Sequence, residues 1–167
     1  MKIQQEIANW DGKSVEALQA IYDCHGLERG FGAALIPLLK EPGLERGASW
    51  LLKLYLEEGG VLSPTEVKQV FQSLSEVKEW ETALHLLQSL PYLTIGKRDV
   101  KQVEAFLRRC LTSENKFVRA WAYNGFYELA LQHPQFKAET DQLLEQAIED
   151  EAASVKARVR NILKQRL

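Results

Sequence analysis

Apolar residues in this chain recur every three or four positions, and almost nowhere in the strict alternation of a strand. Clear examples of this spacing are Val15, Leu18, Ile21 and Tyr22, and later Leu143, Leu144, Ala147 and Ile148. Such a spacing places apolar side chains along one side of an α-helix, whereas a half-buried strand repeats every second residue. The sequence therefore predicts an all-α protein.

Turn-forming residues divide the chain into about ten helices. The expected helices span 2–10, 14–25, 28–40, 44–58, 64–74, 77–90, 98–112, 115–132, 136–150 and 152–166. Short connections predict that each helix runs antiparallel to the next. The clearest start signal is at residues 63–66, where Ser63 is placed to cap a helix, Pro64 to open it and Glu66 to complete a capping box.

The helix pairs repeat along the chain. A shift of 37 residues aligns the segment 113–122 with 150–159 and places Asn124 over Asn161. A shift of 74 residues places Ala48 on Ala122. Self-similarity at this period indicates stacked helix pairs, since each pair would otherwise leave its apolar side uncovered.

Three segments carry a nameable pattern: 34–59 (ALIPLLKEPGLERGASWLLKLYLEEG), 103–131 (VEAFLRRCLTSENKFVRAWAYNGFYELAL) and 143–167 (LLEQAIEDEAASVKARVRNILKQRL). They resemble HEAT repeats, in which Leu-Pro-Leu-Leu in a first helix is followed by a turn and by Val-Arg-x-x-Ala in a second. Pro37 stands at the kink position of the first helix. The family's Asp and Arg pair at the turn is matched only in part, by Asp150 with Lys156 and by Ser113 with Arg119.

The resemblance implies a right-handed superhelix of about five antiparallel helix pairs, of the HEAT or armadillo type. We therefore expect one solenoid domain over 1–167. Its parts are a capping helix pair at 1–30 and repeats at 31–60, 61–96, 97–133 and 134–167, of which 61–96 fits the template loosely. A fold of this kind predicts a surface for binding, without naming what is bound.

Aromatic residues occur at positions that are normally polar in the HEAT-repeat pattern. Trp121, Tyr123 and Tyr127 lie off the apolar stripe of the helix 115–132, and the repeat shift places Trp50 at the position of Asn124. Two interpretations are open: these side chains fill contacts between repeats, or they line a concave face and contact a partner. The second gives a candidate binding set of Trp50, Arg108, Lys116, Arg119, Trp121, Tyr123, Asn124, Tyr127, Lys156, Arg160 and Lys164.

The basic members of this set would suit an acidic peptide or a nucleic-acid backbone. Net charge alternates along the chain, with −5 over 1–96, +4 over 97–119, −6 over 120–151 and +5 over 152–167. The whole chain has a net charge of −2 and a pI near 6.0, which disfavours a general nucleic-acid binder. We expect a non-enzymatic interaction module or adaptor that binds a protein or peptide, with an acidic partner as the specific candidate.

Catalytic and metal-binding patterns are sparse. His25, His85 and His133 are scattered, the cysteines Cys24 and Cys110 are far apart, and no phosphate-binding loop is present. The sequence thus predicts no catalytic residues, no metal and no cofactor. One enzymatic alternative comes from the resemblance to HEAT-like DNA glycosylases, in which Trp121, Glu128 and Arg119 would take the aromatic, carboxylate and arginine roles.

No apolar run reaches the length of a signal peptide or a membrane span. Without a disulfide pattern, a reducing compartment is the default. The expected location is therefore the cytoplasm, with no membrane partner.

Overall fold

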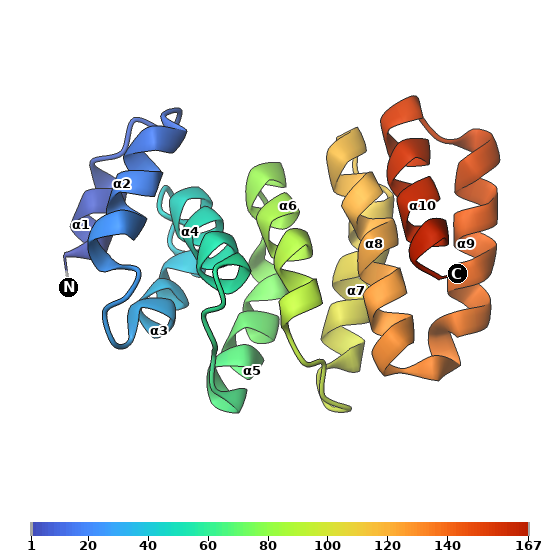
Figure 1. Ribbon diagram of the computed structural model, residues 1–167, viewed down its shortest axis with the longest axis horizontal. Coiled ribbons are helices and arrows are strands. Elements are labelled where there is room, and N and C mark those ends of the chain that lie inside the picture. Colours follow the sequence, from blue (N-terminus) through green and yellow to red (C-terminus); the bar gives the residue numbers. More distant parts are fainter. Residues whose placement is uncertain (1, 167) are drawn as a thin grey trace. The chain divides into compact units, whose positions relative to one another are not determined.

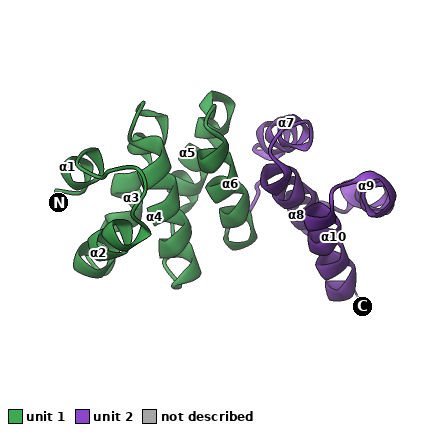
Figure 2. Cartoon of the chain, turned by 90° about the horizontal axis from the view of Figure 1, so that it is seen from above, with its two compact units in different colours: residues 1–92 green, residues 93–167 purple. Residues whose placement is uncertain are grey.

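The computed structural model describes residues 2–166. Ten α-helices and four short 3-10 helices make up this part of the chain, and it contains no strand (Figure 1). The all-α prediction is confirmed. The chain divides into two compact units, residues 1–92 (unit 1) and 93–167 (unit 2), which Figure 2 distinguishes by colour.

Unit 1 contains six α-helices and three 3-10 helices. The α-helices are α1 (Ile3–Ala8), α2 (Val15–His25), α3 (Phe31–Leu35), α4 (Glu45–Glu57), α5 (Pro64–Ser73) and α6 (Trp80–Ser89). The 3-10 helices are η1 (Pro37–Lys40), η2 (Leu74–Glu76) and η3 (Leu90–Tyr92). Helix α4 packs against α2, α3 and α6, so it is the central element of this unit.

The expected helix 28–40 is divided in the structure. Helix α3 begins at Phe31, directly after Gly30, whose φ of +85° is a left-handed conformation that favours glycine. It ends at Leu35, and Pro37 opens η1. Proline has no N–H to donate, and its ring collides with the carbonyl four residues earlier, so an α-helix cannot continue through this position undisturbed.

The predicted capping box at the start of α5 is confirmed. The Ser63 hydroxyl accepts a hydrogen bond from the Glu66 N–H at 3.2 Å. The Glu66 carboxylate in turn accepts from the Ser63 N–H at 2.8 Å. Two N–H groups that the helix itself cannot pair are thereby satisfied, which fixes where α5 begins.

Aromatic packing and one close backbone approach shape the core of unit 1. The ring of Phe31 is fully buried, with the rings of Tyr22 and Tyr55 each 5.7 Å away between centroids. Helix α1 lies so close to α4 that a methyl group on Gly47 would come within 2.8 Å of an Ile7 methyl. A larger residue at Gly47 would therefore push α1 away from α4.

Unit 2 consists of α7 (Val100–Leu111), α8 (Lys116–Gln132), η4 (Pro134–Phe136), α9 (Lys137–Asp150) and α10 (Ala153–Gln165). Asn115 caps α8, because its side-chain oxygen accepts from the N–H groups of Phe117 at 2.9 Å and Val118 at 3.2 Å. Helix α8 packs against α7, α9 and α10, so every other α-helix of the unit touches it (Figure 1).

A hydrophobic cluster joins α8, α9 and α10. Its buried members are Ala120, Tyr123, Leu144, Ala147, Val155, Val159 and Ile162. All of them except Tyr123 are small or aliphatic, so the helices can approach closely around the one large ring. This cluster holds the last helix pair onto α8.

No helix within residues 2–166 combines the length and the apolar character that crossing a lipid bilayer requires.

Candidate binding surface

Helix α8 has large apolar residues on three sides, of which two are buried. One buried side contains Val118, Ala122, Phe126 and Leu129, and a second buried side contributes to the cluster with α9 and α10. Five further residues fall within an arc of about 80° on a third side, since successive residues turn by about 100°. This third side, called the α8 stripe below, consists of Phe117, Trp121, Asn124, Glu128 and Leu131.

The two ends of the α8 stripe are exposed. Phe117 is 49% exposed and Leu131 is 59% exposed, although both side chains are large and apolar. Trp121 and Glu128 are half-buried, and Asn124 is buried. A helix that is apolar on nearly all sides is usually covered on all sides, so the α8 stripe is a surface that a further element would cover.

Trp121 is held in place by an arginine from the neighbouring helix. The guanidinium of Arg158 on α10 lies 4.1 Å from the centroid of the Trp121 ring, which is within cation–π distance. The two residues are 37 positions apart, the repeat period seen in the sequence. The ring and the guanidinium are therefore in direct contact between α8 and α10.

A pocket adjoins the other end of the α8 stripe. It has a volume of about 390 Å³ and lies between α8, α9 and α10. Leu131 belongs both to the α8 stripe and to the pocket wall, and Tyr127 and Ala130 extend this apolar wall. Lys137, Asp141 and Arg166 form a charged rim in which Asp141 pairs with both cations at 3.0 Å. The pocket suits an apolar side chain.

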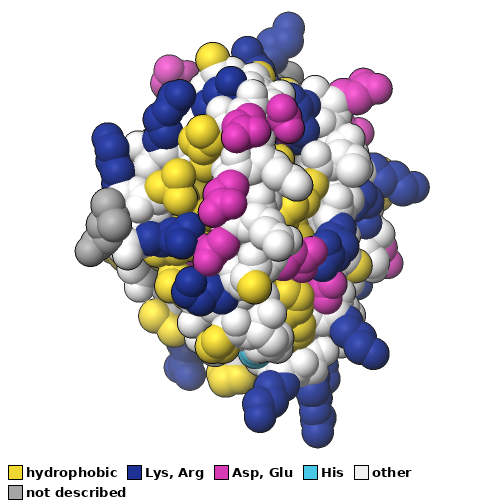
Figure 3. Space-filling model, turned by 90° about the vertical axis from the view of Figure 1, so that its right-hand side faces the viewer, with side chains coloured by type: hydrophobic (Ala, Val, Ile, Leu, Met, Phe, Trp, Pro, Cys, Tyr) yellow, Lys and Arg dark blue, Asp and Glu magenta, His cyan; other side chains and the backbone are white. Residues whose placement is uncertain are grey.

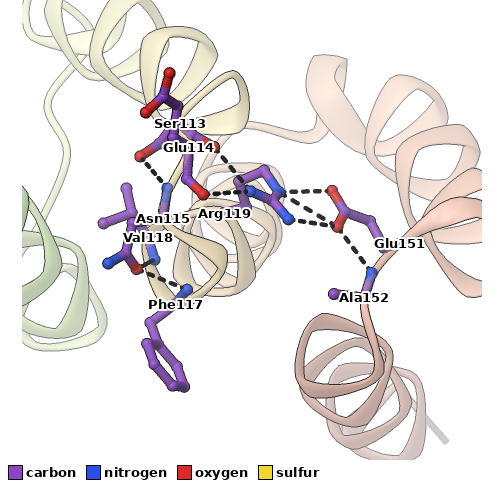
Figure 4. A network of polar contacts seen from close by, with 8 residues as sticks. All are labelled: Ser113, Glu114, Asn115, Phe117, Val118, Arg119, Glu151 and Ala152. Atoms are coloured by element: carbon purple, nitrogen blue, oxygen red, sulfur yellow. Dashed lines mark hydrogen bonds and ion pairs between the residues drawn. The ribbon is translucent and has the colours of Figure 1, made fainter.

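Arg119, predicted to contact a partner, instead joins two turns of unit 2 (Figure 4). Its guanidinium donates to the carbonyl oxygens of Ser113 at 2.9 Å and Glu114 at 3.1 Å. It also pairs with the Glu151 carboxylate at 3.0 Å, which accepts from the N–H of Ala152. Because these partners lie within the chain, Arg119 is a structural residue of unit 2.

Arg108, also in the predicted binding set, connects α7 to α9. Both of its terminal nitrogens donate to Glu139 at 2.9 Å, and its Nε donates to Glu104 at 3.0 Å. Hydrogen bonding to Arg108 lowers the pKa of Glu139, and Glu139 and Glu104 raise the pKa of Arg108. This bidentate geometry pairs Arg108 within the chain, so its charge is already neutralised by Glu139 and Glu104.

Four other predicted cations form no ion pair within residues 2–166: Lys116, Lys156, Arg160 and Lys164. Lys116 lies 5.5 Å from the ring centroid of Phe117. The other three are spaced at four residues along α10, on a different side of that helix from Arg158. Figure 3 shows the α9 and α10 side of the molecule, where basic side chains are interspersed with acidic ones.

The remaining predicted residues divide between core and surface. Tyr123 is 9% exposed within the hydrophobic cluster, and Asn124 is 6% exposed, so neither presents a free surface. Burial and the nearby Glu151 carboxylate raise the pKa of Tyr123. Tyr127 is half-buried beside the pocket. Trp50 is half-buried in unit 1, with Lys53 5.9 Å from its ring.

Glu128 is the unpaired charge of the α8 stripe. Burial alone raises the pKa of its carboxyl group, and no hydrogen bond or ion pair to it is found within residues 2–166. Arg119 cannot serve as its partner, because residues nine apart point to opposite sides of an α-helix. The set of Trp121, Glu128 and Arg119 considered for a glycosylase is therefore not brought together in one site.

Three residues of this surface were not predicted as site residues: Phe117, Leu131 and Arg158. The first two were readable from the sequence, because 117, 121, 124, 128 and 131 follow a spacing of four, three, four and three. Which side of α8 remains uncovered depends on where α10 packs. The role of Arg158 depends equally on this packing, although its repeat position matches that of Trp121.

A serine–histidine contact occurs inside unit 1. The Ser49 hydroxyl lies 2.9 Å from Nδ1 of His85 and donates its hydrogen to the Arg46 carbonyl at 3.1 Å. The Ser49 hydroxyl is thus within hydrogen-bond distance of both the Arg46 carbonyl and the His85 ring. Ser49 is also fully buried. Burial lowers the pKa of His85 to about 3, so the ring is neutral.

A second pocket, of about 590 Å³, lies in unit 1 between η1, α4, η2 and α6. Its walls mix the carboxylates of Glu45, Glu76 and Glu79 with the amines of Lys40 and Lys78. This mixture selects neither an anion nor a cation. Within the described residues, no group of three or more His, Cys, Asp or Glu side chains is arranged to hold a metal ion.

No protein-family model matches the chain, and no curated protein or solved structure matches it either.

Proposed function

We propose that this chain is a HEAT-like stack of helix pairs that acts as a protein-interaction module, with the α8 stripe as its binding surface. The observation that carries the proposal is the placement of Phe117 and Leu131, two exposed large apolar residues, at the ends of one line on one helix. Between them the α8 stripe contains the half-buried Trp121 and Glu128 and the buried Asn124. Large apolar residues that are exposed on one side of one helix point to an interaction surface, whereas scattered ones need no explanation.

Two contacts support the HEAT-like part of the proposal. Arg158 stacks on Trp121 at the repeat distance of 37 residues. Arg119 pairs with Glu151, so that an arginine of one helix pair meets an acid at the turn of the next. The HEAT family uses an Asp and an Arg at these turn positions, and here Glu151 replaces the expected Asp150.

The surface has the composition of an interface centre. At one end Phe117 neighbours Trp121, which Arg158 covers, and at the other end Leu131 lines a pocket with an apolar wall and a charged rim. Aromatic residues and arginine dominate binding energy at interfaces. The predicted basic frame around the aromatic residues contributes less than expected, because Arg108 and Arg119 are paired internally. A protein partner is thus favoured over a nucleic-acid backbone.

Site-specific photo-crosslinking in cells tests this proposal. A photoreactive phenylalanine analogue at position 117 or 131 of the full chain should crosslink to one and the same polypeptide. The matched control is position 27, because Leu27 is fully exposed but lies in unit 1. Equal crosslinking of that polypeptide from all three positions would contradict the proposal.

A further inference from the structure

The α8 stripe has the spacing of a helix that packs along another helix. Its residues are separated by four, three, four and three positions. This is the heptad spacing with which two helices interdigitate their side chains over several turns. Partner helices are commonly bound by such a line of anchors on a groove or helix face.

The middle of the α8 stripe carries a charge without a counter-charge. Glu128 is half-buried, and no ion pair or hydrogen bond to it is found within the described residues. Arg158 stacks on Trp121, seven residues earlier and about 10 Å away along the helix axis. Covering the α8 stripe would bury the Glu128 carboxylate further, which is unfavourable unless the covering element brings a cation.

We infer that the α8 stripe binds an amphipathic helix of a partner protein that carries a lysine or arginine facing Glu128. The inference rests on the proposed function and specifies its partner. Apolar side chains of that helix contact Phe117, Trp121 and Leu131, and its basic residue pairs with Glu128. A polar pair inside a heptad contact sets the register of the two helices, so Glu128 selects both the sequence and the alignment of the partner.

A second copy of this chain is a poorer occupant. Another α8 stripe contains no lysine or arginine to face Glu128. Of the cations beside that second α8 stripe, Arg158 lies over its own Trp121 ring and Lys116 lies against its own Phe117 ring. The charge of the α8 stripe therefore calls for a different helix.

Selection from a displayed library of random 20-residue peptides, with the full chain immobilised, tests the inference. Peptides enriched by the wild-type chain should show apolar heptads with a lysine or arginine at one fixed position. The Glu128→Lys variant should enrich aspartate or glutamate at that position. The best basic peptide, measured by fluorescence anisotropy, should bind Glu128→Gln at least about tenfold more weakly, as expected for loss of a close charge pair.

The matched control is Glu149→Lys, since Glu149 is an exposed acid on α9 for which no ion pair is found within the described residues. It should leave the enriched charge and the affinity unchanged, and circular dichroism should show every variant folded. The inference would be overturned if the enriched heptad peptides showed no charge preference, or if Glu128→Lys enriched the same basic residue as the wild-type chain. Either result would leave the proposed function unaffected. Enrichment of acidic peptides by the wild-type chain would overturn it in favour of the basic side of α10.

Two further outcomes separate the inference from the proposed function. The first uses the double variant Phe117→Glu, Leu131→Glu. If the enriched peptides bind this variant with the same affinity as the wild-type chain, or if the wild-type chain enriches no peptides beyond those that the variant enriches, both the inference and the proposed function are overturned. A dimer of the wild-type chain in sedimentation analysis that this double variant abolishes would show a second copy on the α8 stripe. That result would overturn the partner-helix inference alone.

Discussion

The two units differ in how they distribute exposed apolar side chains. Those of unit 1 are scattered over separate elements, at Val15, Leu27, Val61, Trp80 and Tyr92. Within the described part of unit 2, the exposed large apolar residues are Phe117 and Leu131, and both lie on the same side of α8. Single exposed apolar residues are ordinary on protein surfaces, whereas grouped ones call for an explanation. This contrast is the reason why the proposed binding surface lies in unit 2.

The units also differ in the polar groups that they bury. Unit 1 contains a partly buried neutral contact, His85 with Ser49. Unit 2 contains a partly buried ion pair, Arg119 with Glu151. A buried neutral histidine and a partly buried ion pair respond differently to pH and to mutation, which makes the comparison testable.

The largest expected effect is acid destabilisation of unit 1. Burial lowers the pKa of His85 to about 3 from its ordinary 6.5, so the unfolded chain binds a proton first as pH falls. The contribution to stability is complete above pH 6.5 and is lost as pH falls toward 3. Each pH unit in this window removes about 1.4 kcal/mol. The free energy of unfolding should thus be about 3 kcal/mol lower at pH 4 than at pH 7 from this group.

Urea unfolding at several pH values measures this loss, and His85→Gln should lack it. His25 provides a control of opposite sign, because its hydrogen bond to Glu28, together with Glu6, raises its pKa. The His25 contribution is complete below pH 6.5 and is lost as pH rises through the folded-state pKa. An unchanged acid slope in His85→Gln would contradict the assignment.

The next effect compares two arginines that join neighbouring helix pairs. Arg119→Ala should lower the free energy of unfolding by about 2 kcal/mol, since it leaves Glu151 and two carbonyl groups without this donor. Arg46→Ala in unit 1 should cost about 1 kcal/mol, because Arg46 donates to one carbonyl group, that of Gly12 at 3.0 Å, lies 3.5 Å from Glu81 and is more exposed than Arg119. Chemical denaturation ranks the two, and a larger loss for Arg46→Ala would reverse the comparison.

A smaller effect is expected on the α8 stripe. Replacing Phe117 and Leu131 by serine should change the free energy of unfolding by no more than about 0.5 kcal/mol, since both side chains are exposed. Binding of a hydrophobic dye should nevertheless fall, because the apolar line is interrupted. Leu27→Ser in unit 1 should leave dye binding unchanged. A large loss of stability in the double variant would show that these residues are structural.

The smallest effect concerns the basic side of α10. Changing Lys156, Arg160 and Lys164 to glutamine should alter the free energy of unfolding by less than about 0.3 kcal/mol, since no ion pair of theirs is found within residues 2–166. The contrasting variant is Arg108→Gln, which removes the bidentate contact to Glu139 and should cost more. Thermal unfolding compares the two, and equal losses would show hidden structural roles on α10.

The sequence by itself determined the helices of this protein. Apolar spacing, turn residues and the capping box at Ser63 are local signals, and the expected boundaries lie within a few residues of those found. The exception is the expected helix 28–40, whose α-helical part ends at Leu35 because Pro37 follows. The sequence predicted a kink at Pro37, but not the end of the α-helix. The candidate α8 helix and its aromatic residues were likewise readable from the sequence.

Which of those residues are exposed and which are already paired within the chain depends on tertiary packing. Tyr123 and Trp121 look equivalent in the sequence, yet Tyr123 is enclosed by α9 and α10 while Trp121 lies under Arg158 at the surface. Arg119 looked available and is bound to Glu151, 32 residues away. The physical reason is that exposure and pairing depend on neighbours distant in the chain, which local spacing does not specify.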